Sequence, residues 1–190
     1  MEIEEIIMRC KQGEKEAFRE LLQTVEKKEL ATVHFLAGNK GIAEDILQET
    51  YMKCFIEIHK LKEPQAFKVW FFRILIRTGW KMLKKQSELV PLEITSENEE
   101  LFCDENQGKR NVIDNYEMKS VMENAINDLS ENLKAVVILY YYNDMSIEEI
   151  SKVTGCFKAT IKSRLFYARA ALRKQLGNCM ENEHGVRIVK

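Results

Sequence analysis

A stretch near the C-terminal end of the chain, residues 144–172, constrains the fold more than any other. It holds two short amphipathic segments on either side of Gly155, and Ser146 followed three residues later by Glu149 matches a capping box that begins a helix. Glycine readily adopts the left-handed conformation that ends one helix and turns the chain into the next. The stretch therefore predicts a helix-turn-helix, a motif whose second helix enters the major groove of DNA.

The same stretch has a simpler interpretation, because two amphipathic helices joined at a glycine also form structural hairpins with a solvated surface. Charge helps to separate the two interpretations. The first segment carries Glu148 and Glu149, whereas the second carries Lys158, Lys162 and Arg164. Cations concentrated on the second helix favour a helix that binds DNA phosphates and bases.

Composition predicts an all-α, soluble protein. Of the 190 residues, 45% are hydrophobic and 31% are charged, while 2 Pro and 8 Gly leave few positions for turns. No apolar run approaches the roughly 20 residues that span a bilayer, and the acidic start lacks the basic region of a secretion signal. We therefore expect a cytoplasmic protein without direct membrane insertion.

Residue patterns typical of enzymes are missing from the sequence. The five cysteines are scattered, without the close pairs of a zinc site or a disulfide framework. The sequence contains no metal cluster, no glycine-rich phosphate loop and no Ser/His/Asp arrangement. We predict no catalytic residue, no metal, no cofactor and no small-molecule substrate.

Charge divides the chain into segments. Residues 1–86 hold 16 Lys and Arg against 13 Asp and Glu, residues 116–176 hold 9 against 7, and residues 87–115 hold 2 against 8. The acidic middle segment shows no sustained hydrophobic period, which is typical of a linker. We predict an all-α fold with two small helical domains at 1–86 and 116–176, joined by a flexible acidic linker at 87–115. A polar tail is expected at 177–190, because Gly177 is expected to end the last helix.

An acidic face is predicted on the helix that spans residues 41 to about 60. Asp45, Gln48 and Glu49 fall at positions i, i+3 and i+4 and therefore share one exposed side of this helix. Such a face suits a protein partner that carries Arg or Lys. From these residues alone, a solvated surface remains the competing interpretation.

Aromatic and basic residues alternate in the helix that follows Pro64. Cations that follow phosphates and aromatic rings that stack on unpaired bases suit a single DNA strand or an extruded base. We expect Trp70 and Phe71 to lie in the core and the rings of Phe72 and Trp80 to be exposed.

The order of these segments resembles the extracytoplasmic-function, or group IV, sigma factors of the bacterial sigma-70 family in their two-domain form. The resemblance covers about residues 6–86 and 112–176. Ala-Glu-Asp-Ile-Leu-Gln-Glu at 43–49 is similar to the family's A-E-D-x-x-Q-E in region 2.2. Ala66-Phe67 through Trp70 to Arg73-Ile74 is similar to regions 2.3 to 2.4, and Thr-Ile-Lys-Ser-Arg-Leu at 160–165 is similar to the T-V-K-S-R-L signature of region 4.2.

The resemblance implies a sigma factor that binds core RNA polymerase and directs promoter-specific initiation at −10 and −35 elements. Asp45, Gln48 and Glu49 would bind the clamp helices of the polymerase β′ subunit. Residues 61–65 and the helix after them would open the −10 element, with contacts from Pro64, Lys68, Phe72, Arg73, Arg77, Trp80, Lys81 and Lys84. The second helix of the helix-turn-helix would read the −35 element, with contacts from Lys158, Ala159, Thr160, Lys162, Ser163, Arg164 and Tyr167.

The resemblance also implies further partners. These are the β flap of the polymerase, double-stranded and melted promoter DNA, and an anti-sigma factor, while the acidic linker would occupy the RNA exit path. Arg77 stands where many members have Asn, and Ala159 stands where many have Gly.

Two other classes of protein remain open. A helix-turn-helix transcriptional regulator that binds operator DNA without polymerase would carry the same C-terminal stretch. A helical adaptor that binds only protein would need neither the basic recognition helix nor the aromatic, basic helix after Pro64.

Overall fold

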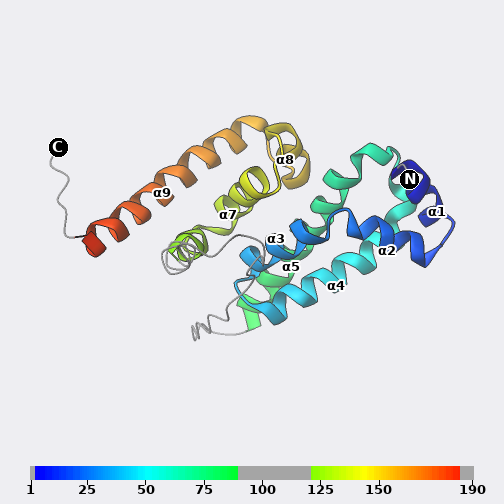
Figure 1. Ribbon diagram of the computed structural model, residues 1–190, viewed down its shortest axis with the longest axis horizontal. Coiled ribbons are helices and arrows are strands. Elements are labelled where there is room, and N and C mark those ends of the chain that lie inside the picture. Colours follow the sequence, from blue (N-terminus) through cyan, green and yellow to red (C-terminus); the bar gives the residue numbers. More distant parts are fainter. Residues whose placement is uncertain (1–2, 90–120, 185–190) are drawn as a thin grey trace, which may run out of the picture.

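The computed structural model describes residues 3–89 and 121–184, and its regular elements there are all helical (Figure 1). This confirms the predicted fold class. The predicted acidic linker lies outside the described residues from residue 90 onward. None of the helices in the described ranges is long and apolar enough to cross a membrane.

The N-terminal body is built around two long helices. Its elements are α1 (Ile3–Lys11), α2 (Lys15–Gln23), α3 (Glu26–Ala37), α4 (Lys40–Glu57) and α5 (Phe67–Leu89), with short 3-10 turns at Ile58–Lys60 and Pro64–Ala66. The Asn39 side chain accepts a hydrogen bond of 3.2 Å from the backbone N of Ile42 and so caps α4. Helices α3, α4 and α5 pack against one another.

The C-terminal body ends in the predicted helix-turn-helix. After a helical stretch at 121–127 come α7 (Glu131–Val137), a π-helical turn (Ile138–Tyr142), α8 (Ile147–Thr154) and α9 (Lys158–His184). Between the last two helices, Gly155 adopts φ +75°, the left-handed conformation that the sequence predicted. Ile150, Val153 and Ile161 are fully buried and hold the two helices together.

The end of α9 differs from the prediction. The helix does not stop at Gly177 but continues to His184, so part of the predicted polar tail is helical. Glycine permits a left-handed helix end but does not require one, and Gly177 has no positive φ. Helix α5 likewise runs to Leu89, past the predicted start of the linker at residue 87.

The most extensively packed helix is α5, which contacts α3, α4 and α8 (Figure 1). Phe71 is buried as predicted, but the prediction that Phe72 is exposed is wrong, because its ring is 0% exposed. Neighbours on several sides bury more of the circumference of α5 than one apolar stripe indicates. Trp70 and Trp80 are both half-buried. Most of the buried apolar side chains form one cluster that includes residues of both bodies, such as Leu75 and Val153, and a smaller separate cluster holds Leu129, Val137 and Ala168.

Candidate nucleic-acid interface

The helix-turn-helix is held by local bonds that its sequence encodes. The Ser146 hydroxyl accepts a hydrogen bond of 3.2 Å from the backbone N of Glu149, and the backbone N of Ser146 donates to Glu149 Oε2 at 2.8 Å. This confirms the capping box. The bond from the Ser146 backbone stabilises the ionised carboxylate and lowers the pKa of Glu149 below its ordinary value. The start of α8 is therefore fixed by side chains within the motif.

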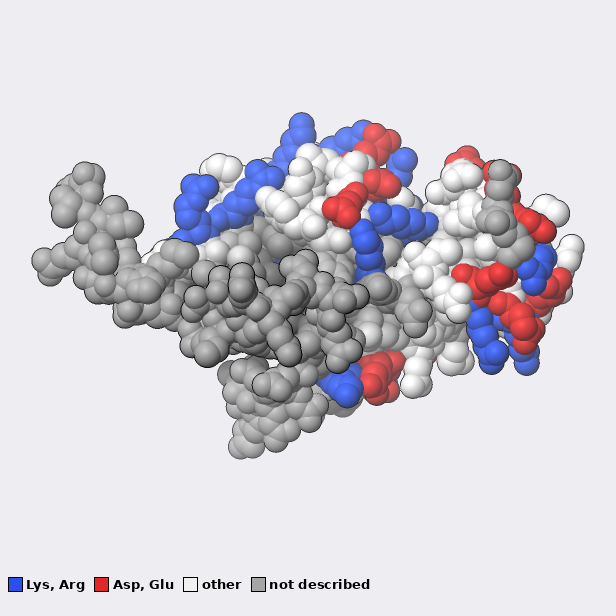
Figure 2. All heavy atoms as spheres, viewed as in Figure 1, with Lys and Arg blue, Asp and Glu red and all other residues white. Residues whose placement is uncertain are grey.

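The residues predicted to read the −35 element lie in the first turns of α9. Lys158, Ala159, Lys162, Ser163 and Tyr167 are exposed, while Thr160 and Arg164 are half-buried. Figure 2 shows Lys and Arg atoms gathered along the part of the molecule that α8 and α9 form. The buried side of the same helix carries Ile161, Leu165 and Ala168. The first turns of α9 therefore present a polar, basic surface backed by a packed apolar one.

Two of the predicted −35 residues are positioned by neighbours in the motif. Lys158 Nζ lies 2.8 Å from Glu148 Oε2, and this bond lowers the pKa of the Glu148 carboxyl, as does a second bond from Lys152. Arg164 Nη1 donates to Cys156 Sγ at 3.3 Å. Both side chains are therefore bonded within the helix-turn-helix, Lys158 to α8 and Arg164 to the turn before α9.

Exposed aromatic rings flank this basic surface, and the sequence reasoning singled out only one of them. Phe157 is 85% exposed immediately before α9, and Phe166 is 68% exposed beside Tyr167 at 63%. The rings of Phe166 and Tyr167 contact edge to face with centroids 5.6 Å apart. The sequence feature that indicates an exposed Phe157 ring is its position directly before the second helix, outside the apolar period of that helix.

The residues predicted for the −10 element are distributed over α5 and the turn before it. Pro64 is half-buried in the 3-10 turn, and Arg77, Lys81 and Lys84 are exposed. Phe72 does not present its ring to any ligand in this arrangement, because it is fully buried. Trp80 is half-buried, and its indole Nε1 is buried without a hydrogen-bond partner.

Two further −10 candidates contact the C-terminal body. Lys68 Nζ donates to the backbone O of Asn143 at 2.8 Å, and Arg73 Nε donates to the backbone O of Lys152 at 2.9 Å. Sequence reasoning assigned no role to Asn143. An Asn-Asp pair between two helices is typical of a turn, but such a pair does not indicate the partner that the turn contacts.

The acidic face lies on α4, where the sequence placed it. Asp45 and Gln48 are exposed, and Glu49 is half-buried and lies 3.0 Å from Lys53 Nζ one turn further along the helix. The opposite side of α4 is in the core, with Ala43 and Ile46 buried. The face is therefore available to a partner while the helix beneath it is anchored.

Across residues 3–89 and 121–184, no group of three or more His, Cys, Asp or Glu side chains is arranged to hold a metal ion. Burial raises the pKa of the Cys54 thiol and of the Cys10 thiol, so both are held in the neutral form. The chemistry that the described surface supports is recognition by charge, hydrogen bonds and rings.

Comparisons with known proteins agree with this surface. The family model described as sigma-70, region 4 matches residues 120–172. The chain is 32% identical over 138 residues to the RNA polymerase sigma factor SigV of Bacillus subtilis (strain 168), covering 73% of this chain and 78% of the relative. It is 25% identical over 183 residues to the ECF RNA polymerase sigma factor SigW of the same organism, covering 93% of this chain and 97% of that relative.

A solved structure has the same fold. It is the sigma factor RpoE of Bartonella quintana, crystallised in complex with the anti-sigma factor NepR. The two chains superpose with a TM-score of 0.68 at 24% identity, over 84% of this chain and 96% of that one.

Proposed function

The chain belongs to the extracytoplasmic-function group of the sigma-70 family of RNA polymerase sigma factors, and we propose the parts of the molecule that carry out each step of its function. A sigma factor directs transcription initiation and is not itself catalytic. We propose residues 1–86 as the region 2 domain and residues 116–176 as the region 4 domain. The region 4 model match at 120–172 supports the second assignment.

The observation that carries the proposal is the surface of α9. Lys162 and Ser163 are exposed on the helix that follows a capped α8 and a left-handed Gly155, as a major-groove reading helix requires. We propose that this surface reads the −35 element, through Lys158, Ala159, Thr160, Lys162, Ser163, Arg164 and Tyr167. Bidentate contacts of Arg164 to guanine would give specificity, and Lys158 would position the helix on phosphates.

Helix α5 is proposed to bind and open the −10 element. Arg77, Lys81 and Lys84 are exposed along it, and Trp80 offers a half-buried ring at its C-terminal half. Cations on one helix attract the melted strand, and a ring can stack on an unpaired base. Pro64, Lys68 and Arg73 extend the proposed surface toward the turn that precedes α5, and Phe72 supports it from the core.

The acidic face of α4 is proposed to bind core RNA polymerase. Asp45, Gln48 and Glu49 would contact the clamp helices of the β′ subunit, since carboxylates suit a basic helical partner. We propose that the region 4 domain meets the β flap. The face lies on a helix whose other side is fully packed, which supports its use as a rigid contact.

The same proposal covers regulation and location. Relatives of this fold include the RpoE chain solved with NepR, and we propose that an anti-sigma factor also holds this chain inactive. Promoter DNA and polymerase share the bacterial cytoplasm, so the chain is proposed to act there on double-stranded and melted promoter DNA.

Run-off transcription with core enzyme and a promoter library tests the proposal. We expect promoter-specific transcripts only when chain and core are both present, and we expect little DNA binding by the chain alone. Arg164→Ala in the same assay should abolish the preference for a −35 sequence while leaving core binding intact. Tight binding to palindromic operator DNA, without initiation, would instead identify a regulator that works without polymerase.

A further inference from the structure

The C-terminal body sits on the helix that is proposed to open the −10 element. Lys68 and Arg73 of α5 each donate a hydrogen bond to a backbone carbonyl of the other body, at 2.8 Å to Asn143 and 2.9 Å to Lys152. A Cβ added at Gly155 would lie 3.8 Å from Arg77 Nη2, so the turn of the helix-turn-helix also approaches α5. Two side chains that are proposed to bind DNA therefore make hydrogen bonds within the chain instead.

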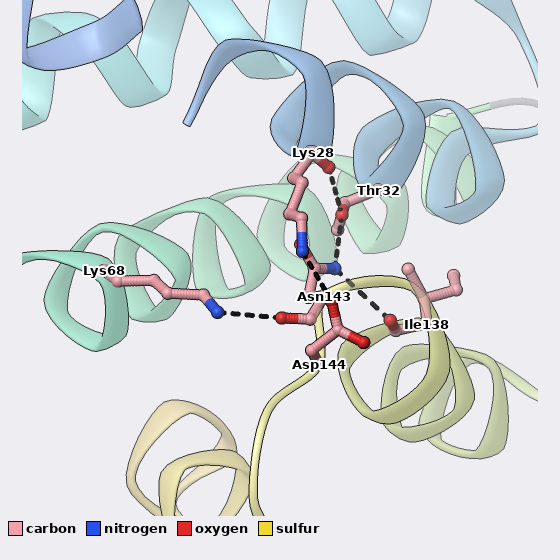
Figure 3. Close-up of polar contacts among 6 residues, drawn as sticks. All are labelled: Lys28, Thr32, Lys68, Ile138, Asn143 and Asp144. Carbon is pink, nitrogen blue, oxygen red and sulfur yellow. Dashed lines mark hydrogen bonds and ion pairs between the residues drawn. The ribbon is translucent and has the colours of Figure 1, made fainter. Parts of the chain in front are cut away.

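A buried polar contact lies at the centre of this arrangement (Figure 3). Asn143 is 0% exposed, and its Nδ2 donates to Thr32 Oγ1 on α3 at 2.8 Å. The same amide donates to Ile138 O at 3.3 Å within its own body. Thr32, itself 0% exposed, donates its hydroxyl proton to Lys28 O at 2.6 Å. A buried amide N–H costs free energy unless its hydrogen bonds are made, so the two Nδ2 bonds favour one relative placement of α3 and Asn143, while Asn143 Oδ1 is buried without a hydrogen-bond partner.

An ion pair closes the edge of the contact. Lys28 Nζ lies 2.7 Å from Asp144 Oδ2, and this bond lowers the pKa of the Asp144 carboxyl. Asp144 has φ +53°, a conformation that Asp and Asn tolerate better than most residues. The turn therefore presents the Asn143 carbonyl to Lys68 and the Asp144 carboxylate to Lys28 side by side (Figure 3).

Apolar packing surrounds the polar contacts. Helix α8 packs along α5, and the rings of Phe35 and Tyr142 meet across the two bodies with centroids 6.5 Å apart. Because the buried cluster runs from one body into the other, the arrangement excludes water from the α5 surface beneath α8.

We propose that these contacts form an autoinhibitory latch, defined by Lys28, Thr32, Lys68, Arg73, Asn143 and Asp144, that keeps the free chain closed. In the closed chain Lys68 Nζ and Arg73 Nε bond to the C-terminal body, and these bonds compete with binding of the −10 strand. The chain must open before DNA reaches them, so the latch lowers apparent DNA affinity by the fraction of closed molecules. The proposal rests on the assignment of α5 to the −10 element.

Carbodiimide cross-linking tests whether the free chain is closed. A zero-length carbodiimide joins amine and carboxylate only when they touch, and mass spectrometry should find the Lys28–Asp144 link in the free chain. Asp144→Asn removes the carboxylate, keeps the tolerance for positive φ, and should abolish that link alone. The pair Lys158 and Glu148 lies within one body and serves as the internal control, with its link unchanged in every variant.

Opening variants test whether closure is inhibitory. Thr32→Val keeps the shape of the side chain but removes the acceptor for Asn143, and Lys28→Glu repels Asp144. Both variants should lower the fraction of closed molecules. In anisotropy titrations, they should therefore bind a fluorescein-labelled random 12-nucleotide single strand about two- to tenfold more tightly than wild type. Lys15→Glu on α2 alters net charge as Lys28→Glu does and should bind slightly more weakly than wild type. Adding Lys68→Ala to Thr32→Val should cancel the gain.

The outcomes separate the latch from the assignment of function. A Lys28–Asp144 link in the free chain together with tighter binding by both opening variants supports the latch. A missing link, or a link with unchanged DNA affinity in the opening variants, overturns it. Run-off transcription by the wild-type chain needs no closed state, so promoter-specific initiation can succeed where the latch fails.

Discussion

Replacing Asp45, Gln48 and Glu49 together by alanine should separate polymerase binding from folding. The contact described for these three side chains is the pair of Glu49 with Lys53 at 3.0 Å, a partly exposed i,i+4 pair worth about 0.3–0.5 kcal/mol. Alanine recovers about 0.7 kcal/mol of helix propensity at Asp45 and less at Gln48 and Glu49, because Gln and Glu are good helix formers. The two effects oppose each other, so we expect the free energy of unfolding to change by about 1 kcal/mol or less. For a chain of this size the melting temperature should move by no more than about 2–4 °C.

Core affinity should respond much more strongly to the same variant. Loss of a desolvated charge contact at an interface typically costs about 2 kcal/mol or more, which is roughly a 30-fold loss of affinity. The assay is titration of a labelled chain with core RNA polymerase, beside circular dichroism melting. A matched control replaces Glu5, Gln12 and Glu16, which are also exposed on the first body. Core affinity equal to that of the control would refute the assignment of the face, and a melting temperature lowered by about 10 °C would show that the face is structural.

Three further predictions concern stability. Gly155→Ala should lower the free energy of unfolding by about 1–2 kcal/mol because of its φ of +75°, and Gly155→Asn by less, as measured by urea denaturation. Because the pKa of Glu149 is lowered in the folded chain, its stabilisation is complete above pH 4.5 and is lost as pH falls through the folded value; Glu149→Gln should flatten the melting temperature against pH in that acid range. Phe72→Ala should cost about 3–5 kcal/mol, whereas Phe157→Ala should stay within about 0.5 kcal/mol, in the same denaturation assay.

Local signals allowed the helix-turn-helix to be predicted from the sequence. The capping box of Ser146 and Glu149 and the positive φ of Gly155 depend on residues within a few positions of each other. Side chains that share a helical face, such as Asp45 and Gln48, follow from the 3.6-residue period in the same way. These features needed no knowledge of the rest of the fold.

Contacts between distant segments could not be predicted in this way. A hydrophobic period reveals the stripe that a helix buries, but not how many neighbours the helix has, and Phe72 was misjudged because α5 packs on several sides. The partner of Asn143 lies on α3, and no pattern in either segment names the other. The prediction that Gly177 ends the last helix failed for a local reason, because a residue that permits a helix end does not require one.

The Lys28–Asp144 bond has a consequence for the newly synthesised chain. Its partners are 116 residues apart, whereas the capping box spans three. Local contacts form early in folding. Closing the long loop between Lys28 and Asp144 costs chain entropy, and only contacts with the completed C-terminal body can offset that cost. At about 5–20 residues per second, a ribosome needs roughly 6–23 s after Lys28 to make Asp144. During synthesis, therefore, each copy of the N-terminal body passes through an interval in which Lys68 and Arg73 have no C-terminal body to cover them.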